Sequence, residues 1–190
     1  MADRMENLQK TPGLLAIAAG VLALVAGILD WYELTTADGT TTYKGTETSA
    51  GLATIGFGVI LLVCGIVLLV RGAKSGGRAS SVIAIIMSLF ILFCAVYSVT
   101  STGDALASFE SSDVGEQFGI PQELAEIQIK AAFDRGDMSA DPMAGAYVGI
   151  LPGALGLLAG IMGLRAGKKI RAGARVEPAP AVASEPPPEA

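Results

Sequence analysis

The segment 49–70, SAGLATIGFGVILLVCGIVLLV, decides the class of fold. None of its side chains is an Asp, Glu, Lys, Arg or His, and the run ends directly before Arg71. A helix of this length rises about 33 Å, and the hydrocarbon core of a bilayer is about 30 Å thick. The segment therefore predicts a transmembrane helix.

Three further segments of similar length and composition lie on either side of it. They cover about 13–32, 79–103 and 142–164, and the first reaches the membrane interface at Asp30, Trp31 and Tyr32. With 52% hydrophobic and 16% charged residues, the chain is too apolar for a soluble domain. We therefore expect an all-α integral membrane protein whose region 13–165 forms a four-transmembrane-helix bundle. A cleavable signal peptide is the competing interpretation of the first segment, but no A-x-A site lies between its apolar core and Trp31.

The distribution of charge predicts the orientation of the four spans. Residues 1–12, the connection between the second and third spans, and residues 165–190 together carry ten basic and five acidic side chains. The two loops at the other side, 30–48 and 104–141, carry three basic and 13 acidic side chains. Because Lys and Arg are retained on the cytoplasmic side, both termini are expected in the cytoplasm. The expected location is the plasma membrane, as the inner membrane of a prokaryote.

The two external loops differ in their expected structure. In loop 30–48, Asp38-Gly39 is a strong turn signal between threonine-rich stretches, which favours a small hairpin. In loop 104–141 we expect a helix from about Pro121 onward, with its apolar residues on one face: Ile120, Leu124, Ile127 and Ala131. Such a helix either caps the bundle or docks a partner. Three acidic residues near its end, Asp134, Asp137 and Asp141, lack the spacing of a calcium loop and are expected to be solvated.

Small residues recur at intervals that place them on one helical face. The spacing is seven residues in the first two spans, at Gly20, Gly27, Gly58 and Gly65. It alternates between four and three in the fourth span, at Gly149, Gly153, Gly156 and Gly160. Since close packing in lipid relies on small residues, these glycines are the predicted helix contacts, within the bundle or through self-association of the fourth span. A kink is expected at Pro152, which cannot donate a hydrogen bond to the Val148 carbonyl.

No chemistry-bearing constellation is found in the sequence. The chain has no histidine, which removes the usual zinc ligand and general base, and its two cysteines, Cys64 and Cys94, lie inside apolar runs. The four apolar cores carry no ionisable carboxylate, amine or guanidinium, whereas intramembrane active sites and ion pathways usually need one. We therefore predict no catalytic residue, no cofactor, no metal site, no enzymatic activity and no nucleic-acid partner.

The tail 166–190 begins with a basic stretch and becomes rich in proline. Lys168, Lys169 and Arg171 are expected to contact anionic lipid headgroups, and the proline-rich remainder is expected to be disordered. The partners predicted are therefore membrane lipids and either a second protein or another copy of the chain. The function predicted is that of a non-catalytic structural or accessory subunit that binds another membrane component. The alternative is a small oligomeric channel or transporter.

Overall fold

A computed structural model of the chain describes residues 2–71 and 77–174. The protein is mostly helical (80%). Four helical segments are long and apolar enough to cross a membrane: Lys10–Ile28, Ser49–Val70, Gly77–Thr100 and Ala144–Ala166. The prediction of a helical protein with four apolar spans is confirmed at this level.

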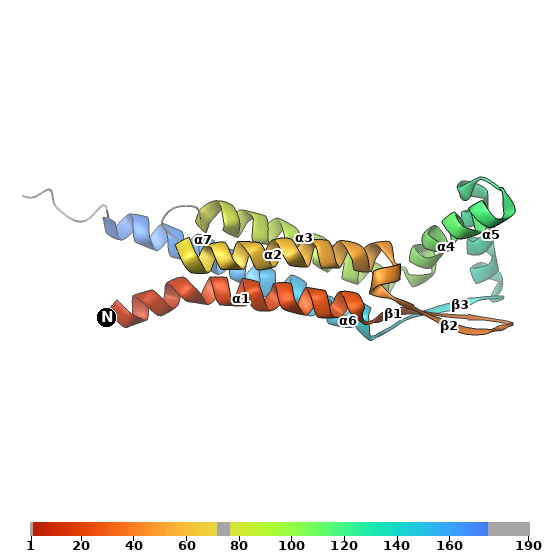
Figure 1. Cartoon of the computed structure of the whole chain (residues 1–190), viewed down its shortest axis with the longest axis horizontal. Coiled ribbons are helices and arrows are strands. Elements are labelled where there is room, and N and C mark those ends of the chain that lie inside the picture. The colour runs from red at the N-terminus through yellow and green to blue at the C-terminus, as the bar shows by residue number, and fades with distance from the viewer. Residues whose placement is uncertain (1, 72–76, 175–190) are drawn as a thin grey trace, which may run out of the picture.

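The four spans pack side by side as a bundle (Figure 1). Its helices are α1 (Ala2–Ile28), α2 (Ser49–Arg71), α3 (Gly77–Thr100), and α6 (Ala144–Val148) followed by α7 (Ile150–Ala174). The most extensive contacts join α1 to α2 and α3 to α7, and the pairs α2–α3 and α1–α7 complete a four-membered ring. Its centre is a cluster of small and aliphatic side chains: Ala19, Ala23, Leu61, Cys64, Ala84 and Ile91.

The connections at one end of the bundle form a separate layer, which we call the cap (Figure 1). It consists of strands β1 (Asp30–Thr36), β2 (Gly39–Lys44) and β3 (Ser139–Pro142), the short helix η1 (Gly45–Glu47), and helices α4 (Thr102–Phe118) and α5 (Gln122–Arg135). The start of α1 and the end of α7 lie at the opposite end of the bundle.

The cap sheet joins the two connections that are far apart in the sequence. It has three antiparallel strands in the order β2-β1-β3. The expected hairpin is present as β1 and β2, and Gly39 after the turn has a φ of 141°, which favours glycine. The third strand was not predicted, because Ser139–Pro142 contains only four residues and has no alternating apolar pattern. Its pairing with β1 ties the second connection to the first.

Several predicted boundaries differ from those of the structure. The first span ends at Ile28 rather than near residue 32, and the helix of the third span ends at Thr100 rather than at Gly103. Pro142, the predicted start of the fourth span, is the last residue of β3. In each case strand pairing or a change of chain direction sets the boundary of the helix. Hydropathy alone reveals neither feature.

The helix of the fourth span is interrupted at Gly149, between α6 and α7. The interruption comes three residues before Pro152, whose ring nitrogen cannot donate to the Val148 carbonyl. It lies near the cap end of the span rather than at its middle, where the sequence placed the expected kink. At the other end, α7 continues through Ala174, and the expected disordered stretch 175–190 lies outside the described residues.

Candidate functional site

The glycines of the first two spans lie where α1 meets α2. A side chain at Gly20 would meet the Gly58 carbonyl oxygen at 2.8 Å, and one at Gly58 would meet the Ala23 side chain at 2.7 Å. Farther from the cap, a side chain at Gly65 would meet the Ile17 amide nitrogen at 2.7 Å. Gly27 lies against the Ile55 side chain. The spacing of seven residues thus keeps one stripe of each helix turned toward the other.

The glycines of the fourth span face α3 in the same way. A side chain at Gly153 would meet Leu92 at 3.0 Å, and one at Gly160 would meet the Ser81 carbonyl oxygen at 2.9 Å. Gly156 lies against the Ser88 hydroxyl, and Gly149 against the Ala95 methyl group. The opposing positions on α3 are themselves small residues, Ser81, Ser88 and Ala95, at intervals of seven. The two helices therefore approach along two complementary stripes of small residues.

Trp31 anchors the cap to the bundle. It is fully buried, and its indole Nε1 donates a hydrogen bond of 2.7 Å to the Ala26 carbonyl oxygen at the end of α1. The register of β1 against β2 shifts between Asp30 and Tyr32, so Trp31 is the extra residue of a β-bulge. Regular alternation would send Trp31 and Tyr32 to opposite faces of the sheet, whereas the bulge lets both side chains enter the core.

Two glycines make room for the indole ring. A side chain at Gly145, in α6, would lie 2.7 Å from the Trp31 Nε1 atom and 2.9 Å from the Asp30 carbonyl oxygen. A side chain at Gly45, in η1, would lie 2.6 Å from the same nitrogen. The indole is therefore enclosed by backbone of η1 in the cap and of α6 at the start of the fourth span. Trp31 was predicted at the interface, but its partners Gly45 and Gly145 were not, because glycine spacing within a span does not identify a contact with a distant side chain.

Tyr32 forms the second link between cap and bundle. It is 2% exposed, and its hydroxyl donates a 2.6 Å hydrogen bond to the Ser98 hydroxyl of α3. Burial raises the pKa of the Tyr32 phenol above its ordinary value, although the bond to Ser98 acts in the opposite direction. The two residues are 66 positions apart, so no local pattern could pair them.

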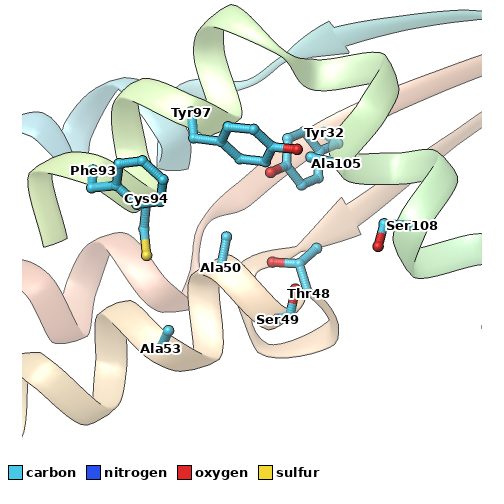
Figure 2. A pocket seen from close by; sticks show the side chains of 10 residues that line it. All are labelled: Tyr32, Thr48, Ser49, Ala50, Ala53, Phe93, Cys94, Tyr97, Ala105 and Ser108. Carbon is cyan, nitrogen blue, oxygen red and sulfur yellow. The ribbon is translucent and has the colours of Figure 1, made fainter. Parts of the chain in front are cut away.

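A cleft of about 250 Å³ opens beside Tyr32, between α2, α3 and α4. We call it the boundary cleft, because it lies where the spans end and the cap begins. It is lined by Tyr32, Thr48, Ser49, Ala50, Ala53, Phe93, Cys94, Tyr97, Ala105 and Ser108. Figure 2 shows the rings of Phe93 and Tyr97 on the α3 side and the alanines of α2 opposite them. No Asp, Glu, Lys or Arg is among these residues.

The two cap helices pack against each other and leave apolar side chains exposed. Ala125 of α5 is buried, whereas Phe118, Leu124 and Ile127 are 68%, 51% and 62% exposed; these three define the cap surface. Leu124 and Ile127 belong to the apolar face predicted for this helix, and both are exposed, whereas Ile120 and Ala131 of the same face are half-buried. Small side chains at Ala125 and Gly115 allow the two helices to approach, so the larger side chains remain outside.

Lys130 links the two cap helices by charge. Its ammonium lies 2.8 Å from the Glu126 carboxylate and 3.5 Å from that of Asp104 in α4. The hydrogen bond to Glu126 is the main reason that the pKa of Lys130 lies above its ordinary value, with a smaller contribution from Asp104. Since all three side chains are substantially exposed, solvent screens this network and it orients the helices only weakly.

The acidic residues of the cap do not converge on a metal site. Among the residues that the structure describes, no group of three or more His, Cys, Asp or Glu side chains could hold a metal ion. Asp137 pairs with its neighbour Arg135 at 2.9 Å, and Asp134 and Asp141 are exposed. Of the predicted headgroup contacts, the Lys168 side chain is exposed, and the side chains of Lys169 and Arg171 lie outside the described residues.

Comparisons of the chain with models of known protein families, with curated proteins and with solved structures found no match. The function is therefore argued from the spans, the cap and the boundary cleft alone.

Proposed function

We propose that the protein is a non-catalytic four-span membrane protein, a structural or accessory subunit that binds another membrane component through its cap. The cap surface carries this proposal. Its three large apolar side chains are exposed and lie outside the four candidate spans, so the proposed topology leaves them in water rather than in lipid. Exposed apolar side chains that face water rather than lipid are typical of a protein-binding surface.

The charge of the cap constrains the partner. The cap connections carry 13 acidic and three basic side chains, and exposed acids such as Glu116 and Glu123 flank the cap surface in the sequence. A partner is therefore expected to offer an apolar patch with a basic rim, since charge complementarity sets orientation and association rate. We place the cap outside the cytoplasm and both termini inside, following the distribution of lysine and arginine.

The absence of Asp, Glu, Lys, Arg and His from the apolar cores supports a non-catalytic role. A channel assembled through the fourth span has less support, because Gly153, Gly156 and Gly160 face α3 within the same chain. Those glycines are consequently not on the outer surface of the bundle, where a second copy would need them.

Co-purification tests the proposal. We would isolate the full chain in mild detergent after replacing Leu124 and Ile127 by serine, with Thr41→Ser on β2 as a control of similar exposure. The wild type and the control should retain the same stoichiometric partner, and the double variant should lose it. A partner retained at wild-type level by a folded double variant would refute binding through the cap surface.

Labelling from each side tests the orientation. In a background of Cys64→Ala and Cys94→Ala, Gln128→Cys reports the cap and Lys168→Cys reports the end of α7. A membrane-impermeant maleimide added to intact cells should label only Gln128→Cys. Labelling of Lys168→Cys alone would indicate the reverse orientation. Labelling of both would place the cap and the end of α7 on the same side of the membrane and would reject the four-span topology.

A further inference from the structure

The lining of the boundary cleft is apolar toward the bundle and carries hydroxyl groups toward the cap. The part nearer the bundle is formed by Ala53, Phe93 and Cys94, which lie within the spans. The part nearer the cap has hydroxyl groups, from Ser49 at the start of α2, Tyr97 in the last turn of α3 and Ser108 in α4. A molecule that occupies the cleft must therefore be apolar at one end and polar at the other.

The hydroxyl groups at the mouth divide into two sets. Tyr32 donates to Ser98, and Thr48 both donates to the Gly45 carbonyl and accepts from the Gly51 amide, so these two are satisfied. The other three, Ser49, Tyr97 and Ser108, are exposed, and within the part of the chain that the structure describes their side-chain hydroxyls have no hydrogen-bond partner from the protein. They come from three different helices and surround one opening.

The chemistry of the lining determines the class of ligand. Hydroxyl groups can donate to ester carbonyls and accept from a free hydroxyl, but they do not neutralise a phosphate. No Lys or Arg lines the cleft, and the surrounding cap is strongly acidic. An uncharged amphipath is therefore favoured over an anionic phospholipid.

We propose that the boundary cleft binds an uncharged glycerolipid of the diacylglycerol class. One acyl chain lies between α2 and α3 against Ala53 and Phe93, and the glycerol region meets Ser49, Tyr97 and Ser108. The cleft has a volume of about 250 Å³. A carbon or oxygen group of the lipid, about the size of a water molecule, occupies about 30 Å³, so the cleft accommodates about eight of them. The cleft thus holds the glycerol region and the first part of one chain, and the rest of the lipid remains in the bilayer. This site is separate from the cap surface. The lipid-binding proposal requires only that the spans lie in a membrane, and not that the cap binds a partner.

Photo-crosslinking tests this assignment. The full chain would be reconstituted in phosphatidylcholine vesicles that contain a small fraction of a photoreactive diacylglycerol, or the same fraction of a photoreactive phosphatidylglycerol. Adducts from the diacylglycerol should concentrate on the peptides around 48–53, 93–97 and 105–108. The phosphatidylglycerol should label these peptides at least fivefold less, while both probes label the outer surface of the bundle equally.

Two variants establish whether the labelling depends on the cleft. Ala53→Phe fills its apolar part and should lower diacylglycerol labelling of the three peptides at least fivefold, whereas Ala154→Phe, at an exposed position of α7, should not. Tyr97→Phe keeps the ring that stacks on Phe93 at 6.0 Å and should lower labelling about threefold, the effect of one hydrogen bond.

Equal labelling of the three peptides by the two probes would overturn the proposal, as would full labelling of Ala53→Phe in a variant that keeps the wild-type helical signal and elution volume. If no peptide of any span were labelled by either probe, the membrane location itself would be wrong. Retention of the protein partner by the folded double variant of Leu124 and Ile127, with intact lipid labelling of the wild type, would instead count against the proposed function alone.

Discussion

Replacing Gly145 by alanine should loosen the cap from the bundle. The added methyl group would overlap the Cδ1 and Nε1 atoms of Trp31, and it would lie 2.9 Å from the Asp30 carbonyl oxygen. The indole cannot move away freely, because it is fully buried and hydrogen-bonded to Ala26. The ring must therefore shift at the expense of this hydrogen bond.

The expected magnitude follows from three contributions. Overpacking of a tight core costs about 1–3 kcal/mol. Loss of the indole hydrogen bond adds about 0.5–1.5 kcal/mol. The greater helix propensity of alanine in α6 offsets about 1 kcal/mol of this. The free energy of unfolding should thus fall by about 2 kcal/mol, which lowers the thermal midpoint of a chain of this size by about 4–8 °C.

Fluorescence offers a direct assay, because Trp31 is the only tryptophan of the chain. In detergent or nanodiscs, the emission of Gly145→Ala should shift to longer wavelength and become more accessible to acrylamide. The control is Gly56→Ala in α2, since a side chain there would meet nothing within 4 Å. It should leave the emission unchanged and the thermal midpoint unchanged or slightly higher.

A double variant identifies the cause. Trp31→Phe removes the part of the indole that carries Cδ1 and Nε1, so it should leave room for the methyl group of Gly145→Ala. The combined loss of stability should be smaller than the sum of the two single losses by at least about 1 kcal/mol. Additive losses, or a Gly145→Ala protein with wild-type stability and emission, would refute the role of Gly145 as the clearance for Trp31.

Three further predictions concern the links between helices. Ser98→Ala should lower the free energy of unfolding, measured by chemical unfolding, by about 1–3 kcal/mol because the Tyr32 hydroxyl loses its buried acceptor. Adding Tyr32→Phe should recover part of this loss, and no recovery would contradict the pairing. Gly160→Ala should lower the thermal midpoint without changing the oligomeric size, because its methyl group would meet the α3 backbone at Ser81 and not another copy. A change in oligomeric size with an unchanged thermal midpoint would favour self-association. Because the pKa of Tyr32 is raised, the unfolded chain loses this proton first as the pH rises above about 10, so stability is kept below that pH and falls above it. The difference in absorbance at 295 nm between the wild type and Tyr32→Phe should therefore titrate above pH 10, and titration below it would contradict the burial.

Hydropathy and spacing predicted the spans because they are local properties. In the segment from Ser49 to Val70, every residue contributes to a helix long enough to cross a bilayer, and no distant contact is needed to recognise it. The seven-residue stripes likewise indicated which faces of α1 and α2 would be closely packed. Whether Gly20 and Gly58 are energetically necessary there stays a prediction, although the structure places them against each other.

The cap could not be predicted to the same extent, because its stability depends on contacts between distant residues. The pairing of Leu34 with Ala140 brings together segments that are more than a hundred positions apart. The fourth span left a similar ambiguity, since its glycine stripe favoured a neighbour in the bundle but was also compatible with a second copy. In the structure the stripe lies against α3.

The sequence by itself thus determined an apolar helical protein with four spans, whose apolar cores contain no Asp, Glu, Lys, Arg or His. The tertiary structure alone decided that a β-bulge directs the side chains of Trp31 and Tyr32 into the same core and that Gly45 and Gly145 enclose the indole. It also decided that α2, α3 and α4 leave a cleft where the spans meet the cap. The physical reason is the range of the interactions. Burial in lipid acts on each segment separately, whereas packing around an indole ring requires backbone from several segments at the same point in space.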